Sequence, residues 1–178
     1  MPMTYTPELR LETPRLWLRP MKPDDLESLL VIFADPKVMA AFDAAPFDRV
    51  QMLRWVQRNL DHQASHGYGL FSVILKRNSL LIGDCGLELM EVDGHMVAEL
   101  GYDFRSDYWC QGYATEAAMV VRDHAFGQLL LPRLVSIIRV GNIPSRRVAE
   151  KIGMRYFGEI TRYGHQYWYY LLEREKTD

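Results

Sequence analysis

The hydrophobic pattern changes from helical to strand spacing at Tyr68, and this change limits the fold more than any other feature of the chain. Three consecutive stretches then follow the two-residue period of β-strands: 69–75, 80–90 and 95–104. Val92-Asp93-Gly94 joins the second stretch to the third, and an Asp-Gly pair is typical of a tight hairpin. Helical spacing returns over 113–128, where small residues share one face. An antiparallel meander followed directly by such a helix predicts an α/β protein with that helix packed closely on a sheet.

The remaining elements follow from the same periodicities and from helix stop signals. Before the meander we expect a strand over 15–19, a helix that starts at Pro23 and stops at Asp35-Pro36, and a helix over 48–65 that Gly67 ends. After it we expect a strand over 134–140, a short helix over 145–152 closed by Gly153, and a final hairpin of 154–161 with 166–172. The expected order is β-α-α-β-β-β-α-β-α-β-β.

Length and composition indicate one globular domain, residues 1–178, with 48% hydrophobic and 25% charged residues. No apolar run approaches the roughly 20 residues of a membrane helix. The N-terminal residues 1–5 have neither a basic nor an apolar region, so we expect no export signal. Cys85 and Cys110 form no CxxC pair, which favours reduced thiols and a cytoplasmic protein without a zinc site.

Positive charge is concentrated late in the chain. Residues 133–162 hold seven basic and two acidic residues, a net charge of +5, whereas the whole chain carries −2 and the remainder therefore −7. A compact positive zone on an acidic protein favours a small phosphorylated ligand over a nucleic acid. The alternative is a basic face that is merely solvated.

The segment 107–117 has the composition of an anion site. It reads Asp107-Tyr108-Trp109-Cys110-Gln111-Gly112-Tyr113-Ala114-Thr115-Glu116-Ala117 and lies between a predicted strand and a predicted helix. Free N–H groups at a helix N-terminus attract phosphate, and Gly112 lets a pyrophosphate approach the backbone. Neither GxGxxG nor GxxxxGK[ST] occurs in the chain. A glycine before a helix can also serve the turn alone, so this segment by itself does not establish a phosphate-binding site.

That context resembles one known family over nearly the whole chain. Residues 11–19, 82–87 and 98–104 look like its opening, third and fourth strands, segment 108–117 like its pyrophosphate loop and helix, and 142–154 like its late Asn-x-x-Ser helix. The family is the GNAT superfamily of acyl-CoA-dependent N-acyltransferases, in particular the RimJ/RimL-type branch of ribosomal-protein N-terminal acetyltransferases. The broad superfamily has Gln or Arg where this loop has Trp109, but that branch often has Trp.

The resemblance implies an α/β GNAT fold: a mixed, mostly antiparallel sheet of six to seven strands flanked by helices, whose fourth and fifth strands splay apart to admit acetyl-CoA. It implies pantetheine along the backbone of the fourth strand, pyrophosphate on the loop amides, and nucleotide phosphates near the late helix, with no metal. The implied acetyl-CoA-binding residues are Leu100, Tyr102, Phe104, Trp109, Cys110, Gln111, Gly112, Tyr113, Ala114, Thr115, Asn142, Arg146 and Arg147.

Acetyl transfer to an amine requires a base, and the resemblance implies Glu99 in that role, acting directly or through water. Glu88 and Asp84 on the preceding strand are the other candidates. Glu99 can also be a surface glutamate paired with a cross-strand arginine. A main-chain N–H of the fourth strand, near 100–102, would meet the oxyanion.

The general acid is harder to assign. Many superfamily members have a tyrosine before the Glu-Lys pair of the late helix, where this chain has Ala149. Ser145 is the hypothetical replacement, although it can also be the N-cap of its helix. Less specific candidates are Tyr163, Tyr167 and Tyr169.

Three further features carry weaker signals. His62 and His66 stand four apart on a predicted helix without a third ligand, and we expect solvated histidines. Cys110 has no activating base nearby in sequence, and we expect it to pack. The aromatic block 167–170 alternates, so half of its rings should pack inward and half should wall the acceptor site.

The sequence therefore predicts an acetyl-CoA-dependent N-acetyltransferase acting on a primary amine. An α-amine has a pKa of about 7.7 to 8.0 and needs little help from a base, and a protein N-terminal α-amine is the acceptor that the branch implies. The alternatives are a small-molecule amine, such as a polyamine, amino sugar or antibiotic, and a non-catalytic acyl-CoA sensor, which Ala149 motivates. Segment 33–55 should shape the acceptor site, and the protein should be a monomer or homodimer without nucleic-acid or membrane partners.

Overall fold

The computed structural model describes residues 9–175. The N-terminal residues on which we expect no export signal lie outside that range. Within it, no helix is both long and apolar enough to cross a membrane.

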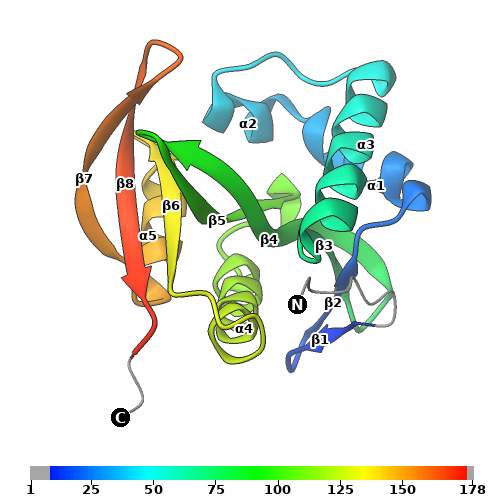
Figure 1. Cartoon of the computed structure of the whole chain (residues 1–178). Coiled ribbons are helices and arrows are strands. Elements are labelled where there is room, and N and C mark those ends of the chain that lie inside the picture. The colour runs from blue at the N-terminus through cyan, green and yellow to red at the C-terminus, as the bar shows by residue number, and fades with distance from the viewer. Residues whose placement is uncertain (1–8, 176–178) are drawn as a thin grey trace.

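The strands form one sheet in the order β1-β2-β3-β4-β5-β6-β8-β7 (Figure 1). All neighbours are antiparallel except β5 and β6, which are parallel. This confirms the mixed, mostly antiparallel sheet. The strands are β1 (Leu11–Glu12), β2 (Leu16–Pro20), β3 (Leu70–Leu75), β4 (Leu80–Val92), β5 (His95–Phe104), β6 (Arg133–Arg139), β7 (Arg155–Arg162) and β8 (His165–Glu173).

The sheet has eight strands where six to seven were predicted, because the opening strand is divided in two. Proline lacks the N–H that a strand ladder needs, and Pro14 lies in a turn in which Thr13 N–H donates to Leu16 O at 3.0 Å. The two-residue β1 folds back on β2 and pairs Leu11 with Leu18.

Helices cover both faces of the sheet, over two hydrophobic clusters. One cluster joins α1 and α3 to the face that carries Leu70 and Leu81, and the other joins α4 and α5 to the face that carries Val73 and Leu87. The helical elements are η1 (Pro23–Asp25), α1 (Leu26–Phe33), α2 (Pro36–Met39), η2 (Ala40–Phe42), α3 (Arg49–His66), η3 (Ser106–Tyr108), α4 (Tyr113–Gly127) and α5 (Ile143–Lys151).

Local signals in the sequence locate several boundaries to within a residue or two. Asp48 caps α3 by accepting the Gln51 N–H at 2.8 Å, and Gly67 ends the helix at φ 74°. Asp93 and Gly94 have φ of 49° and 79°, the left-handed pair that a two-residue hairpin needs. These predictions are confirmed.

The strands β5 and β6 diverge from a single point of contact. Both lie within the described residues, and they form one residue pair, Glu99 with Val135. By contrast, β4 and β5 pair continuously from Gly83–Phe104 to Val92–His95. The splay that the family resemblance implies is therefore present.

Two glycines of the β4–β5 ladder provide a matched test of this packing. A Cβ on Gly83 would lie 2.4 Å from Asp103 O and 2.7 Å from Phe104 Cδ1, whereas a Cβ on Gly101 would meet nothing within 4 Å. We expect Gly83→Ala to lower the free energy of unfolding by about 1–3 kcal/mol and Gly101→Ala to change it by less than about 0.5 kcal/mol. Urea denaturation of both variants checks this, and equal midpoints would contradict the close packing of Gly83 against Phe104.

Candidate active site

Glu99 lies where β5 and β6 part. Its Oε1 accepts the backbone N–H of Ile137 on β6 at 3.1 Å, a group that a continuous ladder would have paired with β5. Burial raises the pKa of this carboxyl to about 7, and the Ile137 hydrogen bond opposes that shift. Glu99 is half-buried rather than a surface residue, and its hydrogen-bond partner is a backbone amide, although the charge of Arg162 also acts on it and opposes the rise of its pKa.

Two side chains span the same divergence on the opposite face of the sheet. The Ser136 hydroxyl donates to Leu100 O at 2.7 Å, and the Tyr102 hydroxyl donates to Ser145 O at 2.7 Å. Leu100 and Phe104 are buried beside them. The sequence pointed only to the backbone of β5 here, and nothing in the local pattern signals these two side-chain hydrogen bonds.

Glu99 belongs to a group of four carboxylates on the face of β4 and β5 that α1 and α3 flank, here called the acidic face: Asp84, Glu88, Glu99 and Asp103. Asp84 is opposite Asp103, and Glu88 is opposite Glu99. Burial, reinforced by Glu88, raises the pKa of Asp103 to about 7, and burial also raises that of Glu88. Asp84 is fully buried, which separates this alternative base from solvent, and its pKa is raised well above the ordinary value.

The loop between β5 and α4 carries the predicted pyrophosphate-binding residues. Gly112 is the N-cap of α4 at φ 84°, and the N–H groups of Tyr113, Ala114 and Thr115 follow it with no acceptor inside the helix. The indole of Trp109 donates to Phe104 O at 2.8 Å, which fixes the loop to the end of β5. The Gln111 amide donates to Asp107 O at 3.2 Å.

Cys110 does not pack, so that expectation is wrong. Its φ of 59° belongs to the turn, and the residue is exposed beside Trp109 in the loop.

Arg15, which the sequence reasoning missed, binds this loop from the turn between β1 and β2. Arg15 Nη1 donates to Gln111 O at 3.0 Å, its Nη2 pairs with Glu116 at 2.6 Å, and its guanidinium lies 4.3 Å from the ring centre of Tyr113. Thr13 also donates to Glu116, at 2.6 Å. About a hundred residues separate the two segments, so local sequence patterns could not predict this contact. The acidic Glu116 in the first turn of α4 is the only local sign that a cation binds there.

At the start of α5, Asn142 rather than Ser145 is the N-cap. Asn142 Oδ1 accepts the Ser145 N–H at 3.2 Å, so the N-cap alternative for Ser145 is wrong. Arg146 pairs with Glu150 at 2.8 Å and lies over the Trp168 ring, whereas Arg147 is exposed.

The basic residues of segment 133–162 do not form one compact zone. Arg139 pairs with Asp43 of the η2 end at 3.0 Å, and Arg162 donates to Met90 Sδ at 3.2 Å. Arg155 lines a separate groove. The arginines of β6 and β7 lie at different ends of these strands and contact different elements, which the linear charge count cannot represent.

Segment 34–48 is tied to the sheet at two points. Ser106, the first residue of η3 just after β5, donates to Asp35, and Arg139 at the end of β6 binds Asp43. Figure 1 shows α2, within this segment, near the same end of the sheet as the diverging strands. The segment is thus fixed to both strands of the divergence.

The aromatic block alternates as predicted. Tyr170 is buried against α5, and Trp168 packs on the same cluster. Tyr167 and Tyr169 pair with Arg139 and Ile137 of β6 and point to the other face, the face of Glu99.

His62 is partly buried and hydrogen-bonded within the fold, which corrects for His62 the expectation of solvated histidines. His62 Nε2 accepts the Leu89 N–H at 2.9 Å, and its ring stacks on His66 with centres 4.4 Å apart. Burial lowers the pKa of His62, and electrostatic interactions with His66 and Arg58 add to that shift. Across residues 9–175 no group of three or more His, Cys, Asp or Glu side chains is arranged to hold a metal ion.

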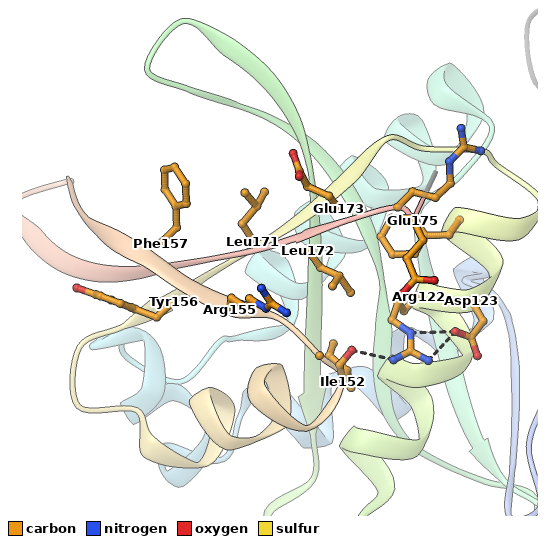
Figure 2. Close-up of a pocket in the computed structure, with 13 residues that line it drawn as sticks. Arg122, Asp123, Ile152, Arg155, Tyr156, Phe157, Leu171, Leu172, Glu173 and Glu175 are labelled. Carbon is orange, nitrogen blue, oxygen red and sulfur yellow. Dashed lines mark hydrogen bonds and ion pairs between the residues drawn. The ribbon is translucent and has the colours of Figure 1, made fainter. Parts of the chain in front are cut away.

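A groove of about 1030 Å³ lies away from these residues, between the end of α4 and the β7–β8 pair (Figure 2). Arg122 crosses it, donating to Ile152 O at 2.8 Å and pairing with Asp123. None of the residues predicted to bind acetyl-CoA lines it.

Comparison with known proteins agrees with this fold. The family model of the acetyltransferase (GNAT) domain matches residues 15–155. The chain belongs to the GNAT acetyltransferase family. YkkB of Bacillus subtilis is 34% identical over 155 residues, covering 86% of this chain and 90% of that protein. The crystal structure of an acetyltransferase from Agrobacterium tumefaciens aligns with a TM-score of 0.81 at 28% identity, covering 96% of this chain and 97% of that one.

This GNAT N-acetyltransferase shares its fold with more distant members as well. The aminoglycoside acetyltransferase AAC(6')-Ib, whose structure is in complex with coenzyme A, aligns with a TM-score of 0.74 at 16% identity over 89% of this chain and 95% of that one. Members of the GNAT family use acetyl-CoA as acetyl donor.

A matched pair of left-handed glycines tests the loop as the pyrophosphate site. In Gly112→Asp, the new carboxylate would accept the free N–H groups of α4 and repel phosphate. We expect this variant to raise the Kd of acetyl-CoA by roughly tenfold or more, measured by calorimetry.

Gly164→Asp is the control, because Gly164 has φ of 78° in the β7–β8 hairpin and the same backbone strain applies there. Its acetyl-CoA affinity should equal that of the unmodified protein. Unchanged affinity in Gly112→Asp would rule out this loop as the phosphate site.

Proposed function

We propose that this GNAT enzyme transfers the acetyl group of acetyl-CoA directly to a primary amine, with Glu99 as the base. The observation that carries the proposal is the position of Glu99 at the point where β5 and β6 part, with a pKa raised to about 7. Such a carboxyl is about half ionised at neutral pH and can both take and release a proton.

Acetyl-CoA is proposed to enter between the diverging strands. Its pantetheine would run along β5 from Leu100 to Phe104, where the ladder to β6 is open beyond the Glu99–Val135 pair. Its pyrophosphate would meet the N–H groups after Gly112, and Asn142 and Arg147 would contact the pantetheine and nucleotide phosphates. Arg147 is exposed, which supports its proposed contact with the nucleotide phosphates. Arg146 would first have to break its ion pair with Glu150.

The proposed reaction needs no acyl-enzyme. The neutral amine nitrogen attacks the thioester carbonyl, the C–N bond forms, and a β5 backbone N–H near residues 100–102 stabilises the oxyanion. The C–S bond then breaks, Glu99 takes the amine proton, and the thiolate takes a proton from the Ser145 hydroxyl, which regains one from water. Ala149 is buried and cannot supply that proton.

Two acceptor classes have support. A protein N-terminal α-amine is the expectation from the sequence, and a ribosomal-protein-S5-alanine acetyltransferase from Vibrio fischeri shares the fold at 20% identity and a TM-score of 0.75. A small-molecule amine is favoured by the acidic face next to Glu99, because a cation placed beside these grouped carboxyls would stabilise their ionised forms.

Glu99→Gln tests the base. Glutamine keeps the size of the side chain but cannot take a proton, so turnover should fall roughly 10²-fold while the Kd of acetyl-CoA changes by less than about threefold. In the unmodified enzyme kcat/KM should rise as pH increases through about 7, because Glu99 must be ionised to accept a proton.

Thiol release from acetyl-CoA, followed across this pH range, measures both effects, with Glu159→Gln as a control at an exposed carboxylate of β7. A Glu99→Gln enzyme with normal turnover would eliminate Glu99 as the base. Tight acetyl-CoA binding without turnover on any amine would instead favour the sensor alternative.

A further inference from the structure

The carboxylates of the acidic face are arranged in two rows with space between them. Gly86 and Gly101 form the cross-strand pair that separates Asp84–Asp103 from Glu88–Glu99. A Cβ on Gly101 would meet nothing within 4 Å, whereas a Cβ on Gly86 would collide with Gly69 O, so the space between the two carboxylate pairs is open on the β5 side only.

Asp84 is the feature that ordinary folding does not explain. Its side chain is fully buried, and among residues 9–175 neither Oδ1 nor Oδ2 has a hydrogen-bond partner. Asp103, directly across the ladder, is half-buried and adds a second negative charge. A buried carboxylate without partners costs several kcal/mol unless it is protonated or meets a cation.

The protein's own cations are engaged elsewhere on this face. Arg58 lies 3.8 Å from Glu88, and Arg162 acts on Glu99. Arg19, the cation near Ser72 on the neighbouring strand, binds Asp25 at 2.6 Å.

The Asp84–Asp103 pair has no comparable neighbour within the part of the chain that the structure describes. The charges that act on its two carboxyls are themselves negative, those of Glu88 and of the paired aspartate. Burial and these negative charges raise the pKa of both carboxyls, so a cation at the open surface beside Gly101 would favour the ionised form of the pair.

We propose that Asp103 and Glu88 form a subsite for a second cationic nitrogen of the acceptor, with the buried Asp84 adding negative charge from across the ladder, and that the acceptor is therefore a small di- or polyamine. This inference rests on the proposed function, since it takes Glu99 as the group next to the reacting amine. Glu99 and Asp103 are four residues apart on one strand, so their Cα atoms are about 13 Å apart. An extended aliphatic polyamine spans such a distance.

An organic ammonium fits this subsite better than a metal ion or a protein N-terminus does. Within the described chain no three side chains are placed to hold a metal ion. A protein N-terminus brings one α-ammonium, which the reaction itself uses, and leaves Asp84 and Asp103 without a partner. A second ammonium on the same small molecule neutralises the pair while the first lies beside Glu99.

The test compares the diamine putrescine with its matched monoamine n-butylamine, adds the longer triamine spermidine, and uses a neutral dipeptide amide as the α-amine probe. We expect kcat/KM for putrescine or spermidine to exceed that for n-butylamine by roughly tenfold or more, the size of one charge-assisted contact. Asp103→Asn should reduce that ratio to below about threefold, mainly through KM.

Asp84→Asn should act in the same direction as Asp103→Asn, with acetyl-CoA affinity by calorimetry as the check that each variant is folded. Glu91→Gln removes one carboxylate from an exposed position on the same strand as Asp84 and should keep the full ratio.

The outcomes separate the two proposals. Equal kcat/KM for diamines and n-butylamine, or preference for the dipeptide amide, would overturn the polyamine subsite and leave the acetyl transfer intact. If no amine is acetylated, the proposed function fails, and calorimetric titration with spermidine then decides the subsite alone. Spermidine binding to the unmodified protein that is lost in Asp103→Asn supports the subsite. If spermidine does not bind the unmodified protein, or binds the variant equally well, the subsite is overturned.

Discussion

The single contact between β5 and β6 is the constraint on which the rest of this structure depends. Beyond the Glu99–Val135 pair the two strands separate, and a buried backbone group that loses its ladder partner must find another. Ile137 N–H finds the Glu99 carboxylate, and Leu100 C=O finds the Ser136 hydroxyl. The divergence is thus held open by side-chain hydrogen bonds, and one of these side chains is the proposed base.

The carboxyls of the acidic face lower the free energy of unfolding when they are ionised, because they are buried at this divergence. Glu99 and Asp103 both have pKa values raised to about 7 by burial, above their ordinary values. A carboxyl whose pKa is raised on folding favours the folded state below its ordinary pKa, and that contribution is lost as pH rises through the folded value. At neutral pH these groups therefore oppose folding, which is consistent with the catalytic and binding roles proposed for them.

Much of the fold could be predicted from local signals, and much less of the site. The helix over 49–66, the Asp93-Gly94 hairpin and the loop with Gly112 follow from caps, turns and periodicity, which act over a few residues. The extra strand β1, the exposure of Cys110 and the hydrogen bond of His62 were not predicted. Each depends on a neighbour distant in sequence or on the exact backbone angle of a turn.

The sequence by itself determined the order of elements, the positions of their caps and the family motifs, because the hydrophobic period and the turn residues encode local geometry directly. Only the tertiary structure decided which charges meet. Arg15 reaches the Gly112 loop across about a hundred residues, and the basic run of 133–162 is divided among separate contacts. Asp84 lies opposite Asp103 because β4 and β5 pair in one register, and a shift of a single residue would place the two side chains on opposite faces.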